Sequence, residues 1–306
     1  MRRVFLLLGF AALAAACGPA AVPARAQVPG LDRLSGQVAP IEVDLPGVDL
    51  ASVRGPAGWI VAGATFDSGR VAGGSAAECA LRRTASGAVA AQTARCASFL
   101  GAYASLERAR QFLLAAGAEA LPAAPLVVDV PDAAPGLRYL PEADAFTLEQ
   151  GPSGARVPAA LNPGAVVREV ALRQLRALAA VRPDDADAVA TFLGAAAAGD
   201  PGYLAASEAG GDPTGQLDLS RPLPSGSSPS EVLAGALWAW ADALGDPAYA
   251  AKAALSAARA VTQRSERGGP AALLSLVAGQ LDGAERDQAC AVFRARLSAG
   301  EIEACP

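Results

Sequence analysis

Short apolar runs separated by Gly and Pro dominate the first part of the chain. These runs have the length of strands, and the Gly and Pro residues between them are typical of turns. Strands are therefore expected at Ile41–Leu45, Trp59–Phe66 and Leu126–Val130, followed by a hairpin that ends at Gly151.

Apolar residues recur at helical spacing in one segment of this first part and throughout the second part. They place one apolar face on a helix over residues 96–116, through Phe99, Tyr103, Leu106, Ala109 and Leu113. Beyond Leu161, helices are expected at 166–181, 185–198, 231–244, 247–265, 270–281 and 284–298. Strands followed by helices predict an α+β fold, with a strand-rich subdomain over 38–160 and a helical subdomain over 161–306.

The N-terminus has the pattern of an export signal. Arg2 and Arg3 precede the apolar run Val4–Leu13, which is shorter than the roughly 20 residues that a membrane-spanning helix needs. The sequence before Cys17 resembles a bacterial lipobox, except that Ala14 stands where Leu is usual. Cleavage before Cys17 would leave this cysteine at the N-terminus with a lipid attached. Ordinary cleavage after Ala26 is the alternative, so the signal is 1–17 or 1–26. A flexible Pro/Ala/Gly-rich tether is expected over 18–37.

The cysteine count favours the first cleavage site. Once Cys17 is set aside, an even set remains, namely Cys79, Cys96, Cys290 and Cys305. In an oxidising compartment these four can form two disulfides, and the local pairs 79–96 and 290–305 are the simplest of three connectivities. The protein is thus expected to be exported, as an envelope lipoprotein or as a secreted or periplasmic protein, with membrane contact only through an N-terminal lipid anchor.

Composition excludes several kinds of chemistry. The chain has no histidine, which removes Ser-His-Asp and Cys-His catalysis and His-ligated zinc. Its formal net charge of −5 argues against nucleic acid as a partner.

Four stretches, within about half of the chain, resemble a known enzyme family: Ser98–Gly117, Leu161–Leu175, Ala186–Leu204 and Ser230–Asp246. Their order is similar to that of the thermolysin-like (gluzincin) metallopeptidases, in particular the compact bacterial forms related to fungalysins. The resemblance implies a zincin-like fold. It also implies that the second stretch leads into the helix that carries H-E-x-x-H in the family, and that the third is the helix that supplies the glutamate zinc ligand.

The residues at the family's functional positions argue against its activity. The five residues that correspond to H-E-x-x-H are Arg168-Glu169-Val170-Ala171-Leu172, so only the general-base position, Glu169, keeps its residue type. The third-ligand position falls near Asp187, with Asp185 and Ala186 as neighbouring registers. One carboxylate cannot replace the three protein ligands of a catalytic zinc. No catalytic residue, metal or cofactor is therefore expected at Arg168, Glu169, Leu172 and Asp187.

A cation at a former histidine position suggests a specific contact. Arg168 could pair with Asp187 across the two helices, so that a guanidinium takes the place of the metal; alternatively, Arg168 is an ordinary surface residue. The predicted function is that of an inactive metallopeptidase homologue (a pseudoenzyme) that is a binding or structural protein, with a peptide or protein ligand in a cleft. The alternative is a hydrolase that uses Glu169 and a metal held by carboxylates.

Overall fold

A computed structural model describes residues 24–31, 37–129, 136–149, 158–178, 181–203, 217–222, 226–264, 269–297 and 302–305. The predicted signal peptide and Cys17 lie outside these ranges. The strands are β1 (Ala24–Leu31), β2 (Val38–Leu45), β3 (Arg54–Gly55), β4 (Gly58–Asp67), β5 (Arg70–Ala76), β6 (Leu81–Arg83), β7 (Val89–Ala91), β8 (Ala124–Val128), β9 (Gly136–Leu140) and β10 (Ala145–Glu149). The helices are α1 (Ala94–Ala115), α2 (Pro163–Arg176), α3 (Pro183–Ala198), α4 (Pro229–Leu244), α5 (Pro247–Arg264), α6 (Pro270–Ala278) and α7 (Gly283–Arg296), with a 3-10 turn at Ala159–Leu161.

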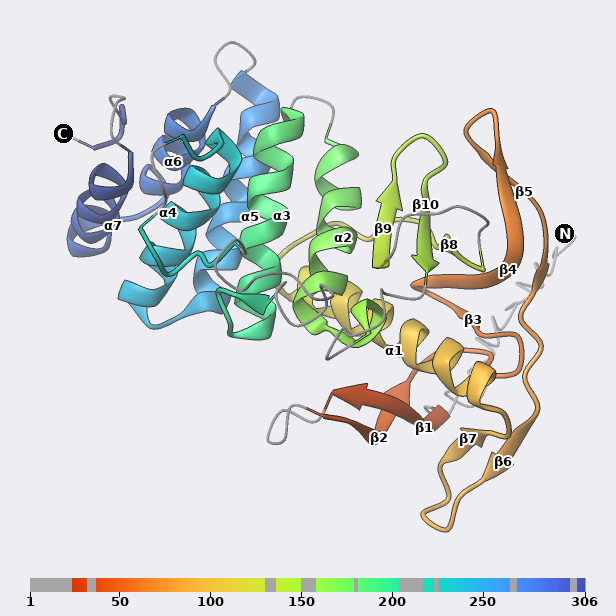
Figure 1. Cartoon of the computed structure of the whole chain (residues 1–306). Coiled ribbons are helices and arrows are strands. Elements are labelled where there is room, and N and C mark those ends of the chain that lie inside the picture. Colours follow the sequence, from red (N-terminus) through yellow and green to blue (C-terminus); the bar gives the residue numbers. More distant parts are fainter. Residues whose placement is uncertain are drawn as a thin grey trace, which may run out of the picture.

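Two sheets and one helix make up the strand-rich part. The first sheet has the order β2-β1-β7-β6, and the second has the order β3-β4-β8-β10-β9, with β5 paired to β4. In the second sheet β4, β8 and β10 are parallel, whereas β9 is antiparallel to β10 and lies at the edge. Helix α1 contacts strands of both sheets and lies between them (Figure 1).

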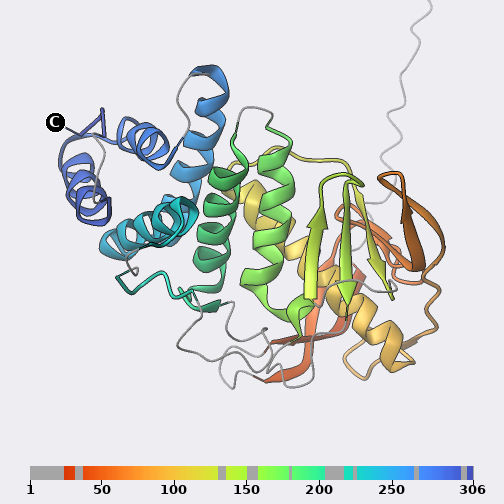
Figure 2. The ribbon, with the colours of Figure 1, turned by 45° about the horizontal axis from the view of Figure 1, so that its top comes forward.

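The helical part is joined to the sheets through α2. This helix contacts α1 and β9 on one side and α3 on the other. The remaining helices follow on the far side of α3, as the green and blue ribbons of Figure 2 show. Strands first and helices afterwards confirm the α+β class. No helix among the described residues has the length and apolarity to cross a bilayer.

The helix boundaries agree with the capping residues in the sequence. The side chain of Asn162 accepts hydrogen bonds from the N–H groups of Gly164 and Ala165, so it caps α2 with Pro163 at the first position. Gly199 ends α3 in the left-handed conformation, with φ of 66°. Helix α2 ends at Arg176, earlier than the predicted residue 181.

Strand β1 corrects the prediction of a flexible tether over 18–37, which is wrong for residues 24–31. The strand pairs with β2 along its whole length, and it also pairs with β7. Ala26 and Val28 point into the core, but the Pro-Gly pair at 29–30 has the composition of a loop. A small residue is needed at Gly30 because a Cβ atom there would collide with the side chain of Ile41 in β2, and α1 lies close to the neighbouring Pro29, since a side chain at Gly101 of α1 would collide with it. The strand-rich part therefore begins at residue 24 and not at residue 38.

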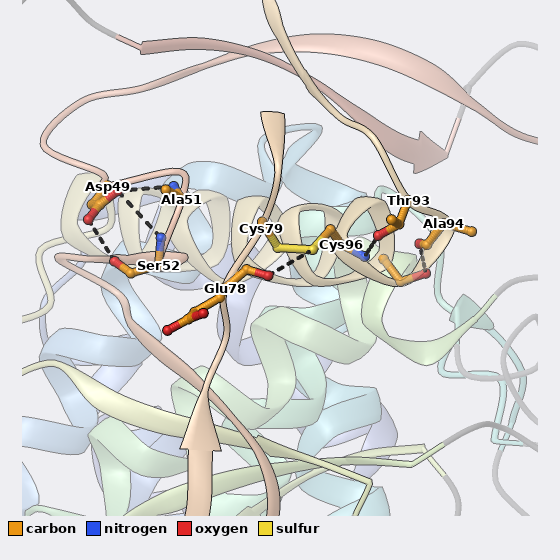
Figure 3. The surroundings of a disulfide bond; sticks show 9 residues. Asp49, Ala51, Ser52, Glu78, Cys79, Thr93, Ala94 and Cys96 are labelled. Carbon is orange, nitrogen blue, oxygen red and sulfur yellow. Dashed lines mark hydrogen bonds between the residues drawn. A yellow bond between two sulfur atoms is a disulfide. The ribbon is translucent and has the colours of Figure 1, made fainter. Parts of the chain in front are cut away.

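Both disulfides join residues that are near in the sequence. The pairs are Cys79–Cys96 and Cys290–Cys305, which confirms the local connectivity. Cys79–Cys96 fastens the segment after β5 to the first turn of α1, where Thr93 accepts a hydrogen bond from the N–H of Cys96 (Figure 3). Cys290–Cys305 fastens the last described segment to α7.

Two glycines allow α2 and α3 to approach closely. A Cβ atom at Gly194 of α3 would lie 2.6 Å from the carbonyl oxygen of Gly164 in α2, and both glycines also lie against the ring of Tyr203. Real Cβ atoms do not approach so closely, so larger residues at these positions would push the helices apart. This close approach brings the side chains of α2 within reach of those of α3.

Candidate functional site

Arg168 of α2 connects two carboxylates. Its Nη2 lies 2.5 Å from Oδ1 of Asp187 on α3, and its Nη1 lies 2.5 Å from Oε1 of Glu169. Its Nε donates a hydrogen bond to Oγ1 of Thr191, at 3.2 Å. The structure therefore confirms the predicted pair between Arg168 and Asp187, and we call Arg168, Glu169, Asp187 and Thr191 the charged cluster.

Glu169 is the most buried of the three charged side chains in the charged cluster. Its side chain is 8% exposed, against 25% for Arg168 and 40% for Asp187. Burial raises the pKa of Glu169, while the charge of Arg168 opposes that rise. Burial alone would lower the pKa of Arg168, but Glu169 and Asp187 raise it above its ordinary value. Arg168 is thus held as a permanent cation between two acids.

The other predicted positions have different surroundings. Leu172 is half-buried and packs against the hydrophobic core. Asp185 is buried and accepts a hydrogen bond from the N–H of Gly269, away from α2. Of the three registers left open for the third-ligand position, Asp187 is therefore the one that reaches the charged cluster. In the part of the chain that the structure describes, no group of three His, Cys, Asp or Glu residues could hold a metal ion.

The sequence analysis missed a contact from the edge strand to the charged cluster. The backbone N–H of Tyr139 in β9 donates a hydrogen bond to Oε2 of Glu169, at 2.8 Å. Glu169 thus joins α2 to the sheet while Arg168 joins α2 to α3. A backbone donor has no signature in the amino-acid sequence, so only the fold shows this contact.

A second missed contact lies one helical turn further along α2. Nε and Nη2 of Arg173 lie 2.6 and 2.8 Å from the two carboxylate oxygens of Asp144, in the turn between β9 and β10. Its Nη1 donates to the carbonyl oxygen of Pro122, and the hydroxyl of Tyr139 donates to Asp144. Glu169 and Arg173 are four residues apart, so they lie on one face of α2. Together they hold the β9–β10 hairpin against that helix.

The pair between Arg173 and Asp144 predicts a pH-dependent contribution to stability. Hydrogen bonds from Arg173 hold the pKa of Asp144 below its ordinary value, so the pair stabilises the fold at neutral pH and this effect is lost as the pH falls through that lowered pKa. We expect Asp144→Asn to lower the free energy of unfolding at pH 7 by about 1 kcal/mol, because the exposed carboxylate is screened by solvent. The difference from wild type should shrink toward pH 3 in urea titrations. Glu142→Gln, an exposed change in the same turn, is the control, and an equal loss at both pH values would contradict the assignment.

Comparisons with known proteins add no family assignment. No protein-family model matches the chain, and no curated protein matches it. The function must therefore be argued from the charged cluster and its surroundings.

Proposed function

We propose that the chain is an exported, catalytically inactive relative of the thermolysin-like metallopeptidases that binds an extended peptide without cleaving it. The observation that carries this proposal is the position of Arg168, whose guanidinium contacts both Glu169 and Asp187. The resemblance places a zinc ligand at position 168, the general base at Glu169 and another zinc ligand at position 187.

The chemistry of these side chains opposes hydrolysis. A catalytic zinc needs three protein ligands and an open position for water, whereas Arg168 is a fixed cation and Leu172 is apolar. Glu169 is the one residue of the family's type, but both of its oxygens accept hydrogen bonds, from Arg168 and from Tyr139. A carboxylate held in this way is poorly placed to take a proton from water.

The arrangement of elements supports the fold that the resemblance implies. The helix with the former H-E-x-x-H positions is α2, and the helix with the third-ligand position is α3; the two pack side by side. The charged cluster lies where these helices meet the edge strand β9.

The position of β1 favours processing at Cys17. Cleavage after Ala26 would remove the first three residues of β1, which pair with Val43, Asp44 and Leu45 of β2. It would also remove Ala26, whose side chain is fully buried. Cleavage before Cys17 leaves β1 whole, and the two disulfides are compatible with an oxidising compartment outside the cytoplasm. We therefore propose a lipoprotein of the cell envelope.

Metal analysis and a peptidase assay on the purified mature protein test the proposal. Because the carboxylates are already paired with Arg168, we expect no stoichiometric zinc and no peptide hydrolysis above that of a Glu169→Gln variant. Stoichiometric metal together with hydrolysis that is lost in Glu169→Gln would refute the proposal and support a hydrolase that uses Glu169 and a carboxylate-held metal.

A further inference from the structure

The outer part of the β4–β5 hairpin is folded back over the second sheet. Residues 58–62 of β4 run parallel to β8, and a straight continuation at about 3.3 Å per residue would carry the tip of the hairpin away from the far end of β8. The tip instead contacts the β9–β10 turn, which lies at the end where β4, β8 and β10 begin. A Cβ atom at Gly69 would lie 3.0 Å from the carbonyl oxygen of Glu142 in that turn. The tips of the two hairpins lie beside each other in Figure 1.

Three glycines lie where the hairpin bends. Gly63 of β4 and Gly73 and Gly74 of β5 have φ of 65°, 67° and 77°, in the left-handed region. A Cβ atom at Gly63 or Gly73 would meet no atom within 4 Å, so glycine is needed there for the backbone conformation and not for lack of room. A straight hairpin has negative φ throughout, so the bend depends on these glycines. We call residues 64–72, beyond the bend, the arm.

The base of the arm is fixed on both strands. Before the bend β4 pairs with β8, and after the bend β5 leads into Cys79, which a disulfide joins to Cys96 of α1. The arm itself has no such tie. Among the described residues, no hydrogen bond or ion pair joins the arm to a residue outside β4 and β5. Movement of the hairpin is therefore confined to the part beyond the three glycines.

A small apolar cluster holds the arm in its folded-back position. Ala64 of the arm packs with Val61 of β4 and Val127 of β8, and the partly buried Phe66 and Val71 of the arm pack against these residues. This cluster is separate from the main core, because it lies on the face of the second sheet that is turned away from α1. Val127 is fully buried there. A few apolar contacts thus hold the arm in place.

We propose that the arm is a flap, which closes over the outer face of the second sheet and opens about Gly63, Gly73 and Gly74 while the rest of the fold stays intact. Glycines at both strands can absorb the change in φ and ψ that a hinge needs. Opening breaks the apolar contacts of the arm and no described polar contact, so it costs less than unfolding of the chain. It exposes Val61 and Val127. The flap goes beyond the function proposed above, since it does not use the charged cluster.

Labelling of a buried cysteine with iodoacetamide measures the opening. Val127→Cys places a thiol beneath the arm, whereas Val128→Cys places one at the next residue, which points into the main core on the opposite face. Opening of the flap exposes the first thiol, whereas unfolding of the chain exposes both. In the mature protein we expect residue 127 to react at least about tenfold faster than residue 128, as read at each position by peptide mass spectrometry. Equal rates would refute the flap.

A disulfide at the tip of the arm provides the second test. Cβ atoms at positions 69 and 142 would lie 3.8 Å apart, which is within the range of a disulfide. Gly69→Cys with Glu142→Cys should therefore lock the arm and slow the labelling of residue 127 at least about tenfold. The reference is Gly69→Ser with Glu142→Ser, which has the same backbone strain without the bond. Labelling of the locked protein at the rate of this reference would refute the flap.

A hinge glycine gives the third test. Gly63→Ala places a Cβ atom on a left-handed backbone, which is unfavourable in the closed arm and is relieved when the arm straightens. We expect residue 127 to react about fivefold faster in this variant, with residue 128 unchanged. Gly87→Ala is the matched control, since Gly87 also has a positive φ, of 85°, and free space around it. An equal effect of both substitutions on residue 127 would refute a hinge at Gly63.

Discussion

Replacing Arg168 by methionine is expected to lower the free energy of unfolding by about 3 kcal/mol. The substitution removes a cation that contacts both Glu169 and Asp187. Glu169, 8% exposed, would then keep the N–H of Tyr139 as its remaining partner in the contacts described above. Breaking a buried pair on one side costs more than the pair contributes, because the other charge stays buried without compensation. Urea titration at pH 7 measures the loss.

Arg95 provides a matched control for this prediction. It forms an ion pair of 2.5 Å with Asp129, but the two side chains are 64% and 58% exposed. Arg95→Met should therefore cost less than about 1 kcal/mol. Adding Glu169→Gln to Arg168→Met should recover part of the loss, since it removes the uncompensated charge. If Arg168→Met costs no more than Arg95→Met, Arg168 does not compensate a buried charge.

Much of the fold could be predicted from local patterns. The alternation at Ile41–Leu45, the cap at Asn162 and the glycine at 199 each act within a few residues, and the structure places a strand, a helix start and a helix end there. Strand β1 could not be predicted in this way. Its glycine at position 30 is explained by the close approach of Ile41 in β2, which no local pattern shows.

The charged cluster was predictable in part. Arg168 and Asp187 could be paired because the resemblance places their positions around one metal. The contact from Tyr139 could not, because it uses a backbone N–H whose direction depends on the order of the strands. Arg173 and Asp144 are 29 residues apart, and they meet because the hairpin folds back on α2. The spacing of four residues between Glu169 and Arg173 was the one signal that pointed to a second contact on this face.

Under the function that we propose, the charged cluster fills a former metal site from within the chain. Two carboxylates that face each other across two helices need a cation between them when they are partly buried. Arg168 supplies that cation from within the chain, and its planar guanidinium reaches both acids and a hydroxyl at once. Under this proposal the stability of the α2–α3 pair does not depend on a bound ion.

Restoring the family's ligands tests whether this cluster stands at a former zinc site. The variant combines Arg168→His, Leu172→His and Asp187→Glu. Positions 168 and 172 lie one turn apart on one face of α2, and the contact between Arg168 and Asp187 shows that α3 is within reach of that face. Glu at position 187 supplies the third ligand, and its side chain is as long as that of the glutamate ligand in the family.

Zinc titration of this triple variant is the most direct test of the central claim, that an arginine has replaced a zinc site in a metallopeptidase-like fold. We predict one zinc per chain with a Kd of about 1 μM or lower, at least about a thousandfold tighter than for wild type. The same variant with Leu172→Ala in place of Leu172→His lacks one ligand and should bind far more weakly. A triple variant that is folded, as judged by its circular dichroism, but binds zinc no better than wild type would contradict the claim.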